Sequence, residues 1–291
     1  MCNYKRSLIL FLFIVLVVTP FTIIQAEEHA EMEVHFIDVG QGDSILIKTP
    51  SDKIILIDGG PPKAGKKVFA YLNKLHIDKI DILVATHPDI DHIGGLPYLL
   101  DKVEVDQIID SGKFHTTLTY AKYINQIRKH EIPVNIARKN ERIDIDPLLN
   151  IQILNTFEFK KGNNQSSIVL KINYKEIDFL LMGDVEREQE IELLKKYNLK
   201  ADIVKVAHHG SKTSSSAAFL KEVNPKVALI TYSKENEYGH PVHRVIDNLY
   251  KLNTHIYSTA VFGDVIVSTD GQGFFILPKK SPMDGILETK G

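Results

Sequence analysis

The chain has 291 residues, of which 44% are hydrophobic, and its 35 Lys and Arg residues nearly balance its 37 Asp and Glu residues. This composition excludes a disordered chain, and the balanced charge excludes a protein that wraps nucleic acid with a wholly basic surface. The single cysteine, Cys2, excludes an intramolecular disulfide and a cysteine-rich zinc module. Metal ligands or nucleophiles in the body of the protein must therefore come from His, Asp, Glu, Ser or water.

Residues 1–26 are typical of a secretory signal peptide. Lys5 and Arg6 precede an apolar run over 8–18, which is shorter than the about 20 residues that a membrane span needs. Ala26, a small residue before two glutamates, marks the expected cleavage point. An uncleaved N-terminal anchor is the alternative, and both interpretations place the body outside the cytoplasm. After cleavage no stable membrane domain is expected.

After residue 30, short β-branched runs alternate with amphipathic stretches, which predicts one α/β domain over 32–277 and a flexible tail over 278–291. The predicted strands are 33–38, 44–49, 53–57, 80–85, 107–109, 151–154, 167–174, 178–182, 202–206, 227–231, 255–258, 264–269 and 273–277. The predicted helices are 66–75, 117–130, 186–197, 214–223 and 242–252. Two packed sheets and one doubly wound sheet both satisfy this pattern.

The segment 80–95, IDILVATHPDIDHIGG, is the most informative part of the sequence. A strand of the buried type is followed within a few residues by His87, Asp89, Asp91 and His92. Burying so many polar groups without a cation would be costly, so the cluster predicts a metal site. Mixed nitrogen and oxygen ligands suit zinc, manganese or iron.

Polar residues also follow three other predicted strands. These are Asp58 in LIDGG, Asp184 in LLMGD, and His208 with His209 in VAHHGS, and a further histidine, His240, lies in a Gly/Pro loop. Since open sheets gather ligands at the carboxyl ends of their strands, one shared cleft is expected. The alternatives are an Asx turn at Asp58, a helix N-cap at Asp184 and a solvent-exposed turn at His240.

Taken in order, these motifs resemble the metallo-β-lactamase superfamily and, within it, the hydrolase domain of the ComEC/Rec2 competence proteins. The resemblance covers roughly 32–275 and is carried by FIDVGQGDSILI (36–47), LIDGG (56–60), THPDIDHIGG (86–95), NNQSSIVL (163–170), LLMGD (180–184), VAHHGS (206–211) and YGHP (238–241). It implies a four-layer αββα sandwich with two divalent metal ions, zinc or manganese, between its sheets.

The resemblance also implies a role for each ligand. His87 and Asp89 would bind the first metal, Asp91 and His92 the second, Asp184 would bridge the two, and His209 would complete the set. Neighbouring residues on an extended strand point apart, so we assign His209 to the metal and His208 to the substrate. The sequence leaves the reverse assignment open.

Three residues are expected behind the ligands rather than on the metal. Asp58 would orient the ligand loop, while Asn163 and Asn164 stand where a histidine is more usual in the superfamily. Asp89 likewise replaces a more frequent histidine. These departures predict a weakly held first metal and leave the choice between zinc and manganese open.

The predicted activity is metal-assisted hydrolysis of a phosphodiester, with DNA as the first choice of substrate. Asp91 would help to hold the attacking hydroxide, and His208 and His240 would stabilise the developing charge or protonate the leaving oxygen. The alternatives are a cell-wall phosphodiesterase, a lactonase or β-lactamase-like carbonyl hydrolase, and a non-catalytic secreted binding protein stabilised by metal. The sequence leaves the oligomeric state open.

Overall fold

The computed structural model describes residues 30–159 and 162–282. The signal peptide expected over 1–26 lies outside these ranges. Within them, no helix combines the length and the apolar character that crossing a membrane requires.

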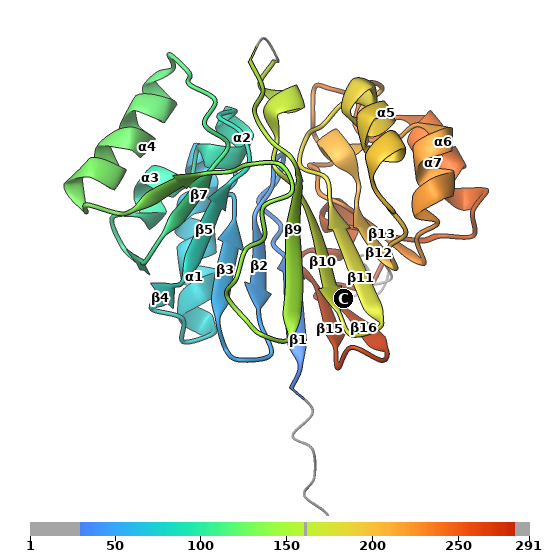
Figure 1. The fold of residues 1–291 in the computed structure, drawn as a ribbon, viewed down its shortest axis with the longest axis horizontal. Coiled ribbons are helices and arrows are strands. Elements are labelled where there is room, and N and C mark those ends of the chain that lie inside the picture. The colour runs from blue at the N-terminus through green and yellow to red at the C-terminus, as the bar shows by residue number, and fades with distance from the viewer. Residues whose placement is uncertain (1–29, 160–161, 283–291) are drawn as a thin grey trace, which may run out of the picture.

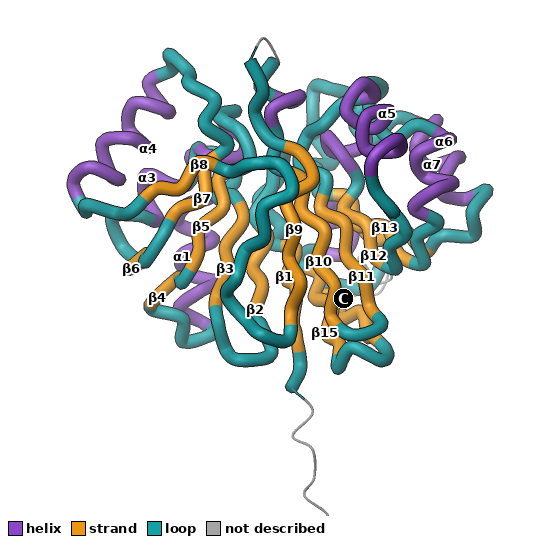
Figure 2. The backbone as a smooth tube through the Cα atoms, in the orientation of Figure 1, coloured by secondary structure: helices purple, strands orange, loops and turns teal. Residues whose placement is uncertain are grey.

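Two sheets form the centre of the molecule (Figures 1 and 2). The first sheet has the order β16-β15-β1-β2-β3-β5-β7-β8 and the second β14-β13-β12-β11-β10-β9. The first consists of β1 (Met32–Phe36), β2 (Ile45–Lys48), β3 (Ile54–Ile57), β5 (Ile82–Ala85), β7 (Ile108–Asp110), β8 (Val134–Ile136), β15 (Val265–Thr269) and β16 (Phe274–Pro278). The second consists of β9 (Leu149–Asn155), β10 (Val169–Tyr174), β11 (Ile177–Leu181), β12 (Ile203–Lys205), β13 (Val227–Ile230) and β14 (His255–Ser258). A short ladder joins β4 (Lys79–Ile80) to β6 (Glu104–Val105).

Helices cover the outer face of each sheet, as the purple segments of Figure 2 show. Those over the first sheet are α1 (Gly65–Lys74), α3 (Leu96–Leu99) and α4 (Leu118–Lys129), with α2 (Ile90–Ile93) at its edge. Those over the second are α5 (Arg187–Lys196), α6 (Ala217–Val223) and α7 (His243–Tyr250), and α8 (Thr259–Phe262) follows β14. This arrangement confirms the four-layer αββα sandwich and excludes the single doubly wound sheet.

The layers follow from the alternation of side chains along each strand. On β2, Ile45 and Ile47 pack in the core between the two sheets, whereas Leu46 faces the helices. On β13, Val227 and Leu229 point inward and the intervening side chain points toward the outer helices. A strand in the middle of such a sandwich is buried on both faces, which explains the continuous apolar runs.

The predicted strands and the five longer helices are present, most of them within two residues of the expected bounds. The pattern did not predict the short elements α2, α3, α8 and β6, nor the edge strand β8, whose three residues are all exposed. The predicted tail begins inside β16, which ends at Pro278, and the backbone amides of Lys279 and Lys280 bond to the carbonyls of Asp264 and Phe262. The body therefore continues past the expected boundary.

The strand directions bring several loops to one edge of the sandwich. β3 runs parallel to β5 in the first sheet, and β11, β12 and β13 run parallel in the second. Parallel strands end at the same side, so the segments that follow β3, β5, β11 and β12 meet there. All the predicted ligand motifs lie in these segments.

Candidate metal centre

The loop after β5 leads directly into α2 and carries the densest group of polar residues. His87 and Asp89 lie in the loop, and Asp89 occupies the N-cap position of α2, which contains Asp91 and His92. The chain near Gly42 packs tightly against this helix, because a Cβ at Gly42 would stand 2.1 Å from the Asp91 carbonyl oxygen. Glycine at this position lets the two segments approach each other.

Four predicted ligands meet at this edge of the sandwich. The candidate ligand atoms of Asp91, His92, Asp184 and His209 all lie within 4.8 Å of one another. Asp184 Oδ2 is 3.3 Å from His92 Nε2 and 3.4 Å from His209 Nε2. Asp91 Oδ2 is 3.4 Å from the same nitrogen of His209. The fold therefore brings residues from α2, the end of β11 and the turn after β12 into one cluster.

Four buried polar atoms of the predicted ligands have no hydrogen-bond partner among the described residues: the Nε2 atoms of His87, His92 and His209, and Oδ1 of Asp184. Each of the three histidines is instead held through Nδ1, which contacts Thr86 Oγ1, Asp58 Oδ2 and the Thr231 carbonyl respectively. Metal-binding histidines usually have their second nitrogen held in this way, because that bond orients the ring. The donor set fits a divalent metal.

His87 and Asp89 form a second group beside this cluster. His87 Nε2 lies 3.5 Å from Asp89 Oδ2, and the His87 and His92 ring centroids are 4.1 Å apart. Asn163 donates a 2.6 Å hydrogen bond to the other oxygen of Asp89. Asn164 contacts the ring of His208 at 3.4 Å. The two asparagines thus lie behind Asp89 and His208, outside the group of imidazole nitrogens.

Asp58, fully buried after β3, anchors both the loop and the ring of one candidate ligand. Its Oδ2 accepts a 2.7 Å hydrogen bond from His92 Nδ1 and a 2.6 Å bond from the Thr86 hydroxyl. Its Oδ1 accepts a bond from the Thr86 amide at 2.9 Å. Asp58 thus contacts a candidate ligand directly, and its role in orienting that ring stays a prediction.

The turn that holds the twin histidines differs from the expected extended strand. His208 and His209 have φ angles of 49° and 53°, in the left-handed region, within the 3₁₀ turn η3 (Ala207–Gly210). Bonds from the His208 amide to Gly183 and from the Ser214 hydroxyl to Ala207 hold this uncommon conformation. The premise of alternating strand side chains was therefore wrong here.

The rings of His208 and His209 nevertheless lie at different depths in the site. His209 is buried in the cluster, whereas His208 lies farther out, with its Nε2 3.8 Å from Asp184 Oδ2 and its side chain 20% exposed. The geometry favours His209 as the ligand and places His208 at the opening of the site.

A row of rings continues from His208 toward solvent. The His240 ring centroid is 5.4 Å from that of His208, and Tyr238 stacks on His240 at 5.6 Å. Asn236 holds this loop through hydrogen bonds to both the amide and the carbonyl of His240. Tyr238 itself is 70% exposed, so the row ends in an accessible aromatic face.

The carboxylates of the cluster dominate its electrostatics. Burial opposes the charge on His92 and His209, but the surrounding carboxylates, Asp184 foremost, raise both pKa values, that of His209 to about 9. Burial also disfavours the charged forms of Asp91 and Asp184, yet the adjacent imidazoles hold the pKa of each carboxyl below its usual range. A proton and a metal ion compete for the same nitrogen atoms at such a site.

The pKa values of His208 and His240, the two histidines at the opening, are lowered instead of raised. Burial lowers the pKa of His208, and burial together with the neighbouring His208 and His209 lowers the pKa of His240 to about 4. Both rings are therefore neutral near pH 7, and each can donate one N–H hydrogen bond.

Two charged residues of the site were missing from the sequence-based set. Asp43 lies in the loop before β2, with Oδ1 3.6 Å from His209 Nδ1, and Lys205 at the end of β12 pairs with Asp43. Both are buried. The signal for Lys205 was a lysine inside the apolar run IVKVA, since a fully buried lysine is rare unless it is paired. Asp43 stands in the quoted motif FIDVGQGDSILI without an assigned role.

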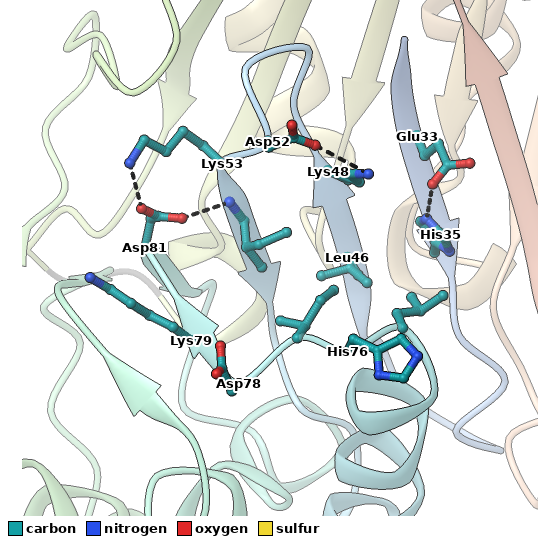
Figure 3. A pocket seen from close by; sticks show the side chains of 13 residues that line it. Glu33, His35, Leu46, Lys48, Asp52, Lys53, His76, Asp78, Lys79 and Asp81 are labelled. Carbon is teal, nitrogen blue, oxygen red and sulfur yellow. Dashed lines mark hydrogen bonds and ion pairs between the residues drawn. The ribbon is translucent and has the colours of Figure 1, made fainter.

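A separate cavity of about 520 Å³ lies at the other end of β3, away from the cluster. Figure 3 shows that several of its charged side chains pair with one another, Lys53 with Asp81 and Lys48 with Asp52. His35, which also lines it, is bonded to Glu33 and Tyr71. The unpartnered buried atoms described above gather instead at the metal centre.

Comparison with known proteins gives consistent matches. The family model described as the metallo-beta-lactamase superfamily matches residues 37–233. ComE operon protein 3 of Bacillus subtilis is 30% identical over 254 residues, which cover 81% of this chain and 33% of that protein. Recombination protein 2 of Haemophilus influenzae is 27% identical over 241 residues, which cover 81% of this chain and 29% of that protein. The chain thus spans about a third of the length of these relatives.

A solved structure supports the same fold. The metallo-beta-lactamase fold protein YhfI from Bacillus subtilis superposes with a TM-score of 0.57 at 14% sequence identity, covering 82% of this chain and all of that chain. This match supports the fold, and the two relatives confirm the resemblance to competence proteins of the ComEC/Rec2 type that the motifs predicted.

Proposed function

We propose that this chain, which belongs to the metallo-β-lactamase superfamily, is a phosphodiesterase that works with two divalent metal ions, zinc or manganese. The observation that carries the proposal is the convergence of three buried imidazole nitrogens, without hydrogen-bond partners among the described residues, on carboxylate oxygens 3.3 to 3.5 Å away. Leaving so many polar atoms unsatisfied is costly, and a cation is the species that these electron-pair donors suit.

The charge of the site supports a pair of ions. Aspartates that lie within 4 Å of a histidine nitrogen of the cluster are Asp43, Asp58, Asp89, Asp91 and Asp184. With the one buried lysine, five carboxylates and one ammonium group leave four net negative charges. Two divalent cations neutralise that charge, whereas one leaves half of it uncompensated. We assign His87 and Asp89 to one ion, and Asp91, His92 and His209 to the other. Asp184 would contribute to both.

Two divalent ions held by these residues would supply an activated water and a positive field for the phosphoryl oxygens. The protein contributes the geometry that serves this chemistry. Asp58 and Thr231 fix the rings of His92 and His209, so the nitrogens need no rearrangement on binding. Asp91 and Asp184 direct their Oδ2 atoms toward the same nitrogen of His209.

His208 and His240 are the groups best placed to contact the substrate. They lie at the opening, outside the ligand cluster, and both are neutral near pH 7 because of their lowered pKa values. A neutral imidazole can donate an N–H hydrogen bond to a phosphoryl or leaving oxygen. This favours charge stabilisation over full proton transfer as their first role.

A single-stranded nucleic acid, DNA first, is the proposed substrate class. One curated relative is named for recombination, a process that acts on DNA. The exposed ring of Tyr238, stacked on His240, offers a surface on which a base beside the cleaved phosphate can stack. Stacking tolerates any base sequence, so it is compatible with cleavage that does not depend on sequence.

We place this activity outside the cytoplasm, on the basis of the signal peptide that the sequence predicts over 1–26. A fusion of these residues to a reporter enzyme that works only outside the cytoplasm tests the placement. Export of the reporter is expected, and retention in the cytoplasm would contradict it.

A substrate panel tests the proposed activity directly. Purified protein loaded with Mn²⁺ or Zn²⁺ is offered single-stranded DNA, RNA, bis-p-nitrophenyl phosphate, a cell-wall teichoic acid, a lactone and a chromogenic lactam. Metal-dependent cleavage of the phosphodiesters, abolished by a chelator and restored by the metal, is expected. Turnover confined to the lactone or lactam would overturn the proposal in favour of a carbonyl hydrolase.

Replacing Tyr238 with Ala is expected to raise the KM for a short single-stranded oligonucleotide by about 5- to 100-fold, with little change in kcat. The basis is the loss of base stacking, which contributes roughly 1 to 3 kcal/mol per base. Cleavage of an oligonucleotide that is abasic beside the cut should respond little to the substitution. Tyr250→Ala, at a tyrosine of α7 that is 74% exposed, is the matched control. Equal KM values for Y238A and the unchanged protein would exclude the stacking role.

A further inference from the structure

Lys205, the buried lysine at the metal centre, has no role in the proposed chemistry so far. Lys205 ends β12, where Ile203 packs in the core between the sheets and Val204 faces the outer helices. Alternation therefore points the Lys205 side chain inward, at the end of the core that meets the metal centre. Its side chain is fully buried.

Three oxygen atoms surround the ammonium group. Lys205 Nζ pairs with Asp43 Oδ2, donates a 3.2 Å hydrogen bond to the Gly183 carbonyl, and lies 3.8 Å from Asp184 Oδ1. Gly183 and Asp184 are consecutive, so the lysine contacts both the side chain and the adjoining backbone of the shared carboxylate.

The two oxygens of Asp184 consequently face different groups. Oδ2 lies among the imidazoles, 3.3 Å from His92 Nε2 and 3.4 Å from His209 Nε2. Oδ1 is buried, has no hydrogen-bond partner among the described residues, and has the lysine cation on its side. A buried cation at this distance favours the orientation in which Oδ1 points away from the metal side.

We propose that Lys205 is a positioning residue for Asp184, holding Oδ1 and the Gly183 carbonyl so that Oδ2 alone is presented to the metal ions. The inference rests on the proposed metal centre, and it names a role for a residue that binds neither metal nor substrate. It predicts that the lysine acts on metal affinity through Asp184, separately from its pairing with Asp43.

The competing explanation is that Lys205 only neutralises the buried carboxylate of Asp43. Asp43 also accepts a hydrogen bond from the Thr231 hydroxyl, and its amide bonds to the Asp91 carbonyl, so it joins the two sheets at this edge. Removing one partner of a buried pair destabilises a protein because the other charge is left uncompensated. Lys205→Met alone therefore does not distinguish the two explanations.

A comparison in the Asp43→Asn background separates them. With Asp43 already neutral, adding Lys205→Met leaves no unpaired charge at position 43. A lysine that serves only Asp43 then acts on the metal through its positive charge alone, and its removal would leave Mn²⁺ binding equal or tighter. If Lys205 positions Asp184, the D43N/K205M protein is expected to bind Mn²⁺ about 10- to 100-fold more weakly than D43N, the range typical of residues that support metal ligands. Titration calorimetry with Mn²⁺ and metal analysis of the purified proteins measure the difference. Equal affinities in D43N and D43N/K205M, or tighter binding by D43N/K205M, overturn the proposal.

Two further variants complete the experiment, one as a control and one as a substitute if the D43N proteins do not fold. Lys171→Met removes another buried lysine of the same sheet, one that bonds to the Asn198 carbonyl away from the metal centre, and should leave Mn²⁺ affinity unchanged. If the D43N proteins fail to fold, Lys205→Gln in the otherwise unchanged chain replaces them. Its shorter, neutral side chain can donate a hydrogen bond to Asp43, but it removes the cation beside Asp184 Oδ1. Thermal unfolding of the chelated protein verifies the fold, and undiminished Mn²⁺ binding by K205Q overturns the proposal.

Because this test measures metal affinity, its outcome does not depend on the proposed catalytic activity. If the unchanged protein binds Mn²⁺ but cleaves no phosphodiester, the proposed activity fails while the role of Lys205 is still decided by calorimetry. If phosphodiester cleavage is present and the D43N/K205M protein matches D43N in both affinity and kcat, the role of Lys205 fails alone.

Discussion

Replacing Asp184 with Asn is expected to remove metal-dependent hydrolysis and at least one bound metal ion per chain. Asp184 Oδ2 faces both His92 and His209, and the residue is buried, so its charge is central to holding a cation there. The loss of kcat should exceed the about 10- to 100-fold cost typical of residues that only support metal ligands. Steady-state kinetics with bis-p-nitrophenyl phosphate and metal analysis of the purified protein measure both effects. Asp91→Asn should act in the same direction.

Asp178→Asn is the matched control for this prediction. Asp178 lies near the other end of β11, where it bonds to Asn173 and pairs with Lys171, and neither partner contacts the cluster. Its substitution should leave both kcat and metal content unchanged. Thermal unfolding in the presence of a chelator shows whether D184N keeps its fold. Undiminished turnover by a folded D184N protein would defeat the assignment of the site.

The fold was predictable to the extent that burial leaves a pattern in the sequence. Strands such as β3 and β5 are apolar at every position because the sandwich covers both of their faces. The edge strand β8, with all three residues exposed, has no such pattern and was missed. The short helix α2 was missed because four residues are too few to show a helical period, and two of them, Asp91 and His92, are polar candidate ligands.

The candidate site was predictable where its ligands are neighbours in the sequence. His87, Asp89, Asp91 and His92 form a visible cluster, and the motif order supplied Asp184 and His209. The conformation of the turn η3 was not predictable, because residues other than glycine rarely adopt left-handed φ angles.

The pairing of Asp43 with Lys205 could not be inferred for a different reason. It depends on which loop of the first sheet lies opposite the end of β12 in the second, and this is a property of the packed sandwich. Sequence spacing carries no record of that contact. A buried-type strand containing a lysine indicates that a partner exists, but the partner's identity comes from the three-dimensional arrangement alone.

The metal-free protein is expected to lose stability as the pH rises from about 6.5 to about 9. The His209 pKa is raised from 6.5 to about 9 in the folded state, chiefly by Asp184 acting against the effect of burial. A group whose pKa is raised on folding stabilises the protein fully below its unfolded pKa, and this contribution is lost as the pH passes through the folded pKa. His92, whose pKa is also raised, acts in the same direction.

The size of this effect follows from the shift. For His209 alone the loss is on the order of 3 kcal/mol, which corresponds to a fall in Tm of roughly 6 to 12 °C for a protein of this size. The lowered pKa of His240, about 4, changes stability only below pH 6.5, outside this window. Calorimetric unfolding of chelated protein at half-unit steps of pH measures the dependence.

Loading with Mn²⁺ or Zn²⁺ is expected to suppress this pH dependence, because the metal replaces the proton on the same nitrogen atoms. Metal affinity should then rise with pH over the same window, and it should level off once the histidines are deprotonated in the free protein. His209→Gln should flatten the profile of the chelated protein, whereas His255→Gln, at an exposed histidine of β14, should preserve it. A Tm of the chelated protein that is constant or rising from pH 6.5 to 9 would show that the histidines are uncharged in the absence of metal. The carboxylates around His92 and His209 would then be too weak to hold a proton, and their expected attraction for divalent cations would lose its basis.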